Sequence, residues 1–381
     1  MNDRHEMTAT FGAALVLVVG MGFGRFAFTG LYPLMVADHQ ISVEGGSYAA
    51  SANYAGYLIG ALLAALLSGI PSHRLCSIAT FMTVITLGVL AAPMPEWLIV
   101  SVRGLAGLFS AISMVAASHW LINDRRHYAG APALYAGVGL GIFLSAELIA
   151  VGYNAELTSY QVWLALAVAA LVFTISAIVI QARTGRFVPR QQASHRGLAE
   201  APQVLLGATR LNIIYGLAGL GYIVTATYLP LLVGSALASL NPVHIWAIFG
   251  LGAAPSCFLW HFLHAKWGLH RSLKINLWIQ AIGVALPIIH TPASYITSAL
   301  LVGGTFMGTV TIAMPAARQL SAKVRFNMLA VMTASYGVGQ IVGPLIASAL
   351  YARTASFDAS LLIAALALLG AGALCFKPST H

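Results

Sequence analysis

Hydrophobic residues in this chain form long runs without strict alternation, and most charged residues lie in the short segments between the runs. A membrane-spanning helix needs about 20 apolar residues, whereas a barrel strand shows about ten residues of alternating hydrophobicity. The pattern therefore predicts an all-α integral membrane protein with twelve transmembrane helices, at residues 8–36, 46–69, 76–93, 96–121, 129–153, 160–181, 204–234, 243–265, 273–290, 293–317, 327–351 and 359–376.

The composition excludes a soluble globular protein. Hydrophobic residues make up 59% of the chain and charged residues 8%, and the mean hydropathy is +0.85, whereas soluble domains carry about 25% charged residues. Cys76, Cys257 and Cys375 are scattered and suggest neither a disulfide framework nor a metal site. His261 and His264 have no third ligand in their helix, so we expect no metal and no cofactor. The first apolar run lacks a small-residue cleavage site, and we expect its helix to be retained.

The basic residues indicate an orientation in the membrane. Almost all of those outside the predicted spans lie on alternate loops, and Arg353 alone lies on the opposite side. The positive-inside rule then places both termini in the cytoplasm. Because orientation accounts for the formal net charge of +9, we expect no nucleic-acid partner. We expect a multi-pass monomer whose partners are the lipid bilayer, a small-molecule substrate and protons.

The chain is internally duplicated, mostly at an offset of 197 residues. We therefore expect an N-terminal six-helix half at residues 1–182, a cytoplasmic linker loop at 183–203 and a C-terminal six-helix half at 204–381. Transporters built from parallel repeats bind substrate near the bilayer midplane, between the halves. The repeats pair Gly22 with Gly219, Gly24 with Gly221, Pro33 with Pro230, His73-Arg74 with His270-Arg271, and Tyr-Ala-Gly137-Val-Gly139 with Tyr-Gly337-Val-Gly339.

Arg25 is the main candidate for contact with a substrate. It is the one charged residue between Met7 and Met35, and an arginine near the bilayer centre costs roughly 2.5 kcal/mol or more unless it faces protein or water. A guanidinium group can bind a carboxylate or phosphate bidentately. The alternative is a structural arginine satisfied by backbone carbonyls. The repeat places Tyr222 at the equivalent position, so the predicted site carries charge from one half only.

Arg103 and Glu147 are the other charged residues that we expect inside the membrane. Both are expected in the outer half of the membrane, where a salt bridge between them is geometrically feasible. The pair has two interpretations: a buried structural bridge, or a protonatable Glu147 whose release from Arg103 opens the outer gate or carries a coupling proton. Glu147 facing solvent near its helix end is a third.

Uncharged polar residues complete the candidate site. Asn53 and Tyr57 lie four residues apart, on one face of the second span. Each tyrosine of this span is equally compatible with packing. The glycines near these positions are expected to serve close helix packing rather than substrate contact. The substrate-binding candidates besides Arg25 are Asn53, Tyr54 and Tyr57 in the N-terminal half and Tyr222, Thr225 and Gln340 in the C-terminal half.

Several motifs resemble those of the major facilitator superfamily. Arg103-Gly104-Leu-Ala-Gly107 resembles its fourth-helix signature, and Gly137-Val-Gly139-Leu-Gly141 occupies the place of its glycine-rich fifth-helix motif. Gly69-Ile-Pro-Ser-His-Arg74 lacks the aspartate of the superfamily's cytoplasmic loop. The chain is most similar to the bacterial YbfB/YjiJ branch, through Gly22-Phe-Gly-Arg25-Phe-Ala, Ser51-Ala-Asn53-Tyr54-Ala-Gly-Tyr57-Leu-Ile-Gly60, Met314-Pro-Ala-Ala-Arg318 and Gly337-Val-Gly339-Gln340-Ile-Val-Gly343-Pro344. This resemblance implies the bacterial inner membrane and leaves the substrate open.

These observations predict a secondary active transporter, not an enzyme, because the chain has no P-loop or nucleophile elbow. We expect it to move a small organic solute, with an anion as one option, by alternating access coupled to protons. One alternative is a proton-driven multidrug or metabolite exporter with an apolar cavity. An alternative of another class is a non-transporting membrane sensor or scaffold.

Overall fold

A computed structural model of the chain describes residues 2–67, 69–184, 206–236, 242–321, 324 and 328–376. These residues form helices joined by short turns, and no strand occurs among them. The N-terminal part contains α1 (Asn2–Leu17), η1 (Val18–Phe26), α2 (Ala27–Ala37), α3 (Val43–Leu66), α4 (Ser72–Leu90), α5 (Glu96–Ser118), η2 (His119–Asp124), η3 (Tyr128–Gly130), α6 (Ala131–Asn154) and α7 (Ser159–Thr184).

The described C-terminal part is also helical, and its longest helix contains a turn. Within α9, Gly268 adopts φ 72° and ψ 177°. A positive φ is readily adopted only by glycine, and here it turns the chain between two of the predicted spans. The elements of this part are α8 (Ala208–Ala236), α9 (Pro242–Ala285), η4 (Leu286–Ile289), α10 (Pro292–Ser321), α11 (Met328–Thr354) and α12 (Asp358–Ala373).

The helices confirm the predicted all-α membrane fold. Each of the twelve predicted spans coincides, within the described residues, with a helix or a run of consecutive helices. Eight helical stretches in this part of the chain are long and apolar enough to cross a membrane, and α12 is a shorter apolar helix. The predicted linker at residues 183–203 lies almost entirely outside the described residues.

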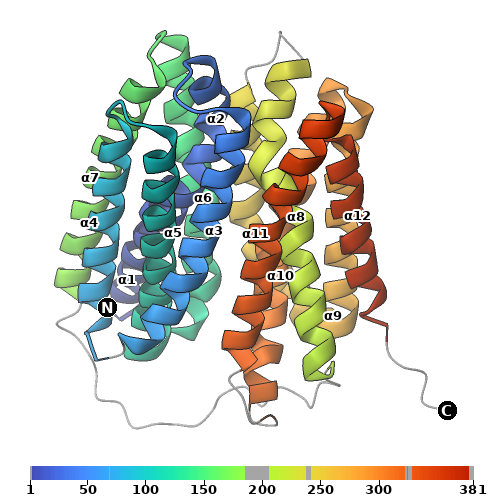
Figure 1. The fold of residues 1–381 in the computed structure, drawn as a ribbon. Helices are drawn as coiled ribbons and strands as arrows, with labels where there is room; N and C mark the ends of the chain where they lie inside the picture. The colour runs from blue at the N-terminus through green and yellow to red at the C-terminus, as the bar shows by residue number, and fades with distance from the viewer. Residues whose placement is uncertain are drawn as a thin grey trace.

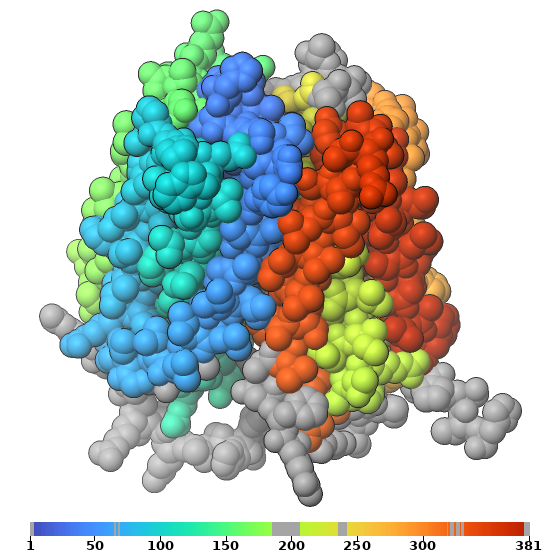
Figure 2. Space-filling model, viewed as in Figure 1, coloured from blue at the N-terminus to red at the C-terminus, as the bar shows by residue number. Residues whose placement is uncertain are grey.

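The helices form two bundles side by side, with α1 to α7 in one bundle and α8 to α12 in the other (Figure 1). Figure 2 shows the same division on the surface, where α3 and α11 meet along the boundary. We call the end of the molecule at which α1 begins the α1 end. The opposite end, where α2 ends and α3 begins, is the far end.

Direct hydrogen bonds join the two bundles in the part of the molecule toward the far end. The Thr29 hydroxyl donates to the Ala226 carbonyl at 2.8 Å, and these two residues are separated by 197 positions, the offset of the sequence repeat. The helices that are equivalent in the two halves therefore meet each other. Further bonds join the hydroxyls of Tyr54 and Thr227 (3.0 Å), Tyr228 to Ser47 (2.8 Å), Ser51 to the Ile341 carbonyl (3.1 Å) and Trp246 to the Phe26 carbonyl (3.0 Å).

The halves also meet where α6 packs against α9 without space for side chains. A Cβ atom on Gly139 would overlap the backbone of Ala254, and one on Gly250 would lie 2.5 Å from the Phe143 nitrogen. The backbones approach this closely only because glycine occupies both positions, as is common between membrane helices.

We expect Gly139→Ala to lower the free energy of unfolding by about 1–3 kcal/mol, the usual cost of overpacking. The measurement is the melting temperature of the detergent-purified protein. The matched control is Gly370→Ala on α12, where a Cβ would meet nothing within 4 Å. This control should leave the melting temperature unchanged or raise it slightly, since alanine favours helix more than glycine does. Equal melting temperatures for the two variants would contradict the proposed close packing.

Candidate functional site

A cavity of about 450 Å³ lies between the two bundles. It reaches the α1 end at His119 and Asn123, and Asn123 is exposed. Toward the far end, the hydrogen bonds described above join the two bundles to each other. The cavity is lined by Met21, Arg25, Phe26, Tyr57, Ala61, Leu62, Met114, Val115, Ser118, His119, Ile122, Asn123 and Tyr135 from the N-terminal half, and by Tyr215, Tyr222, Phe306, Met307, Val310, Met314, Thr333, Tyr336, Gly337 and Gln340 from the C-terminal half.

Arg25 lies on the cavity wall and is 3% exposed. Its guanidinium carbon lies 4.1 Å from the ring centroid of Tyr57, 5.0 Å from that of Tyr54 and 5.2 Å from that of Phe26. Such cation–π contacts offset part of the cost of burying the charge. The Nε atom is buried without a hydrogen-bond partner. In the described residues each ion pair joins a histidine to a carboxylate, and none includes Arg25.

Arg25 is carried by a π-helical segment, η1, which interrupts the first membrane span. The wider spacing of π-helical hydrogen bonds displaces carbonyl groups from the regular helical ladder, and such segments are frequent at functional sites. Arg103, on α5, binds two carbonyl groups of this segment. It donates to the carbonyls of Gly24 and Arg25, both at 2.9 Å, and its guanidinium carbon lies 4.5 Å from the ring centroid of Phe28.

The described residues contain no salt bridge between Arg103 and Glu147, which two of the three interpretations require. Arg103 is 1% exposed, and its guanidinium is bound to the backbone of η1. Glu147 on α6 instead lies 3.7 Å from the Nδ1 atom of His244 on α9, and both side chains are about half exposed. The error arose because similar depth along two spans was taken as proximity, whereas the rotation of each helix about its axis directs the two side chains to different neighbours.

Three further predicted residues line the cavity, namely Tyr57, Tyr222 and Gln340. The Gln340 side chain donates through Nε2 to the hydroxyl of Tyr222. Its Oε1 atom is buried without a partner. Arg25 and Tyr222, which are equivalent in the sequence repeat, therefore line one cavity from different halves.

Asn53, Tyr54 and Thr225 do not belong to the cavity lining. Asn53 donates through Nδ2 to the carbonyl of Arg103 at 2.9 Å, and so fastens α3 to α5. The Tyr54 hydroxyl bonds across the halves to Thr227, and Thr225 is fully buried with an unpartnered Oγ1. The structure thus places these residues in helix contacts around the site.

The sequence analysis missed an aromatic wall in the C-terminal half. The ring of Tyr222 stacks on Phe306 with centroids 5.5 Å apart and on Tyr336 with centroids 5.7 Å apart. Tyr336 stacks in turn on Tyr215 at 4.5 Å. A signal existed for Tyr336 and for Tyr135 of the other half, because each begins one copy of the repeated glycine motif. No comparable signal marks Phe306.

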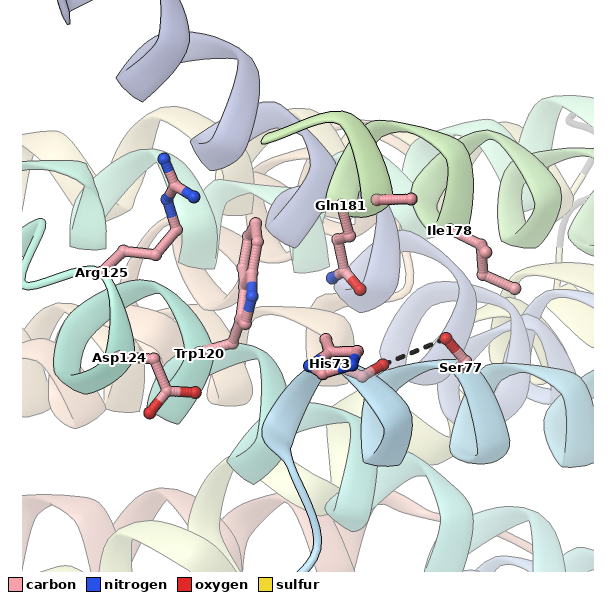
Figure 3. Close-up of a pocket in the computed structure, with 8 residues that line it drawn as sticks. His73, Ser77, Trp120, Asp124, Arg125, Ile178 and Gln181 are labelled. Atoms are coloured by element: carbon pink, nitrogen blue, oxygen red, sulfur yellow. Dashed lines mark hydrogen bonds between the residues drawn. The ribbon is translucent and has the colours of Figure 1, made fainter. Parts of the chain in front are cut away.

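A second cavity, of about 340 Å³, lies at the α1 end of the N-terminal half between α4, η2 and α7 (Figure 3). Asp124 and Arg125 bring opposite charges to it, and Arg125 donates to the Thr184 carbonyl at 2.7 Å. Partial burial lowers the pKa of Arg125, and the carboxylate of Glu6 opposes this shift. His119 links the two cavities, since it lines the larger one and its Nδ1 lies 3.2 Å from Asp124. No group of three metal-ligating side chains occurs among the described residues.

We expect Arg103→Leu to lower the free energy of unfolding by about 1–3 kcal/mol, because two buried carbonyls would lose a charged donor. Melting temperatures in detergent would measure this loss. Arg103→Lys should lose less, since an ammonium group can keep one of the two bonds. Glu147→Gln is the control, and it should melt like the wild type because the carboxylate is half exposed. Equal destabilisation by Arg103→Leu and Glu147→Gln would instead indicate that the two residues act as a pair.

Comparisons with known proteins agree with this architecture. Residues 17–376 match a family model described as "Uncharacterised MFS-type transporter YbfB". Among solved structures, the nucleoside transporter NupG superposes with a TM-score of 0.69 at 15% sequence identity, covering 99% of this chain and 100% of that one. A mutant of NupG gives the same TM-score at 14% identity, covering 97% of this chain and 100% of that one. At this identity the structures show a shared fold. No curated protein matches the chain. The chain is a multi-pass membrane protein of the YbfB family of major facilitator superfamily transporters.

Proposed function

We propose that this protein is a secondary active transporter of small organic anions. The observation that carries the proposal is the charge of the central cavity. Arg25 places a guanidinium on its wall, and none of the described lining residues is an aspartate or glutamate. Since no carboxylate pairs with Arg25 among the described residues, an anionic substrate would supply the missing partner.

The position of Arg25 favours substrate recognition over a purely structural role. The structural alternative was an arginine held by backbone carbonyls of the glycine-rich segment. In the structure, Arg103 makes those bonds. A buried charge without a partner costs several kcal/mol, and binding of an anion would recover part of that cost. Arg25 is also within reach of both halves, because Tyr222 and Tyr336 of the C-terminal half line the same cavity.

The distribution of contacts between the halves supports alternating access. The hydrogen bonds between the halves lie toward the far end, while the cavity reaches the α1 end. If the basic loops lie in the cytoplasm, as the positive-inside rule predicts, the α1 end faces inward and this conformation is open to the cytoplasm. We propose that the halves, residues 1–182 and 204–381, rock about the site in the inner membrane of a bacterium, with both termini cytoplasmic.

Proton coupling is proposed to act through Glu147 with His244 as its partner. The two side chains belong to different halves, and attraction between them requires an ionised carboxylate and a protonated imidazole. Protonation of Glu147 would remove this attraction and favour separation of α6 from α9. In this proposal Glu147–His244, rather than Arg103–Glu147, is the titratable contact that links proton binding to the separation of α6 from α9.

A second candidate function is export of apolar compounds. It is favoured by the four methionines of the cavity wall, Met21, Met114, Met307 and Met314, because flexible thioether side chains suit promiscuous binding surfaces. This alternative predicts that ligand binding is independent of Arg25.

We expect Arg25→Ala to abolish anion transport while leaving the fold intact. The Arg25 contacts that hold η1 use its backbone carbonyl, which alanine retains. A thermal-shift screen of carboxylates, organic phosphates, neutral compounds and cations would identify a stabilising ligand. Uptake of this ligand into proteoliposomes would then be compared between the wild type and the variant.

The control for this experiment is Arg353→Ala, which removes an exposed arginine at the end of α11. It should transport at the wild-type rate. Normal transport by Arg25→Ala would remove Arg25 from the site and support the apolar exporter.

We expect Glu147→Gln to uncouple transport from a pH gradient, because glutamine cannot bind or release a proton. Proteoliposomes with an imposed pH gradient should then show equal initial uptake with and without the gradient, whereas exchange of substrate across the membrane continues. His244→Gln should weaken the same coupling. Proton-driven uptake that is unchanged in both variants would reject this role for the pair.

A further inference from the structure

We infer that the anion is an aromatic monocarboxylate, whose carboxylate binds Arg25 and whose ring lies against the aromatic side chains of the cavity. The inference rests on the proposed function, because it assigns a substrate class to the anion site described above. Three features of the cavity support it: the contact of Arg25 with the Tyr57 ring, the aromatic side chains of the C-terminal half, and the number of positive charges in the lining.

The contact between Arg25 and Tyr57 leaves the guanidinium able to bind a carboxylate. The guanidinium carbon lies 4.1 Å from the ring centroid of Tyr57, and the Nε donor is buried without a partner. The N–H donors of a guanidinium lie in its plane, at the edge. Stacking and bidentate binding of a carboxylate therefore do not compete, and the rings around Arg25 would also contact a substrate bound at its edge.

Aromatic side chains of the C-terminal half also line the cavity. Tyr222 and Phe306 are nearly parallel, with an angle of 16° between their planes, and Tyr222 and Tyr336 enclose 20°. Because these rings already stack on one another, a planar substrate ring would contact them edge to face, and each contact of this kind stabilises beyond the area that it buries. A saturated ring of similar size would bury comparable area without this contribution.

The single charge limits the substrate to one carboxylate. Arg25 is the one arginine or lysine among the described residues that line the cavity. A second carboxylate of a dicarboxylic acid would be desolvated without a partner, which is strongly unfavourable. The Oε1 atom of Gln340 is a buried acceptor without a partner, and a hydroxyl group on the substrate ring is the complementary donor. The volume of about 450 Å³ lies within the usual range for small-molecule sites.

The test compares four probes on the detergent-purified protein: 4-hydroxybenzoate, benzoate, cyclohexanecarboxylate and benzamide. Dissociation constants come from the rise in melting temperature with ligand concentration. We expect benzoate to bind about three- to tenfold more tightly than cyclohexanecarboxylate, the range given by one aromatic contact. Benzamide, which is aromatic but neutral, should not raise the melting temperature. 4-Hydroxybenzoate should bind at least as tightly as benzoate.

Variants separate the two parts of the inference. Tyr336→Leu should reduce the preference for benzoate over cyclohexanecarboxylate to near one, while both carboxylates still bind. Tyr153→Leu, which changes an exposed tyrosine outside the cavity, should keep the wild-type preference. Arg25→Gln should abolish binding of both carboxylates.

Each outcome decides between the two proposals. Equal binding of benzoate and cyclohexanecarboxylate by the wild type would overturn the aromatic inference and leave the anion site standing. Binding of benzamide as tight as that of benzoate, or unchanged benzoate binding by Arg25→Gln, would overturn the proposed anion transporter itself. A preference that survives in Tyr336→Leu would remove this tyrosine from the ring-binding wall.

Discussion

The central site depends on the two hydrogen bonds that Arg103 donates to the carbonyls of Gly24 and Arg25. They attach α5 to the π-helical segment, and Asn53 attaches α3 to the backbone of Arg103. Three helices of one half are thereby fixed around Arg25. Arg103 donates to neutral carbonyls and its Nε is buried without a partner, so no carboxylate of the described residues compensates its charge. Arg25 is the one arginine or lysine of the described cavity lining, and its charge is the physical basis of the proposed selectivity for anions.

One hydrogen bond joins two positions that the sequence repeat pairs. Thr29 and Ala226, 197 residues apart, are hydrogen-bonded to each other across the interface. The paired positions differ in chemistry at the cavity, which Arg25 lines from one half and Tyr222 from the other. A parallel repeat places equivalent side chains around one axis, so two arginines there would repel each other in a confined, poorly solvated space. An arginine in one half and a tyrosine at the equivalent position of the other avoid this repulsion. A substrate in the cavity would then meet a charged group from one half and an aromatic group from the other.

The twelve helices and four of the cavity residues could be predicted from sequence for identifiable reasons. The number of long apolar runs predicts the number of membrane helices. A charged residue within such a run requires a protein or aqueous environment, and this requirement identified Arg25. The repeat then led to Tyr222. The partner of Arg103 could not be predicted, because depth in the membrane does not give the rotation of a helix about its axis. The π-helical segment changes this rotation within the first span, and no sequence feature marked it.

The polar contacts between the halves are ones that the proposed conformational change can break at small cost. In the described residues they consist mostly of single hydrogen bonds between neutral groups, such as Trp246 to the Phe26 carbonyl, and they lie beside the close packing of α6 against α9. Each contributes only about 0.5–1.5 kcal/mol net, since water replaces the lost partner when a bond breaks. In the proposed cycle, substrate binding would have to supply a difference of a few kcal/mol between the conformations to shift their equilibrium. The Glu147–His244 pair differs from these bonds because its attraction changes with protonation. In the proposed mechanism the neutral bonds would be indifferent to pH, and this pair would be the contact through which a proton gradient biases the conformation.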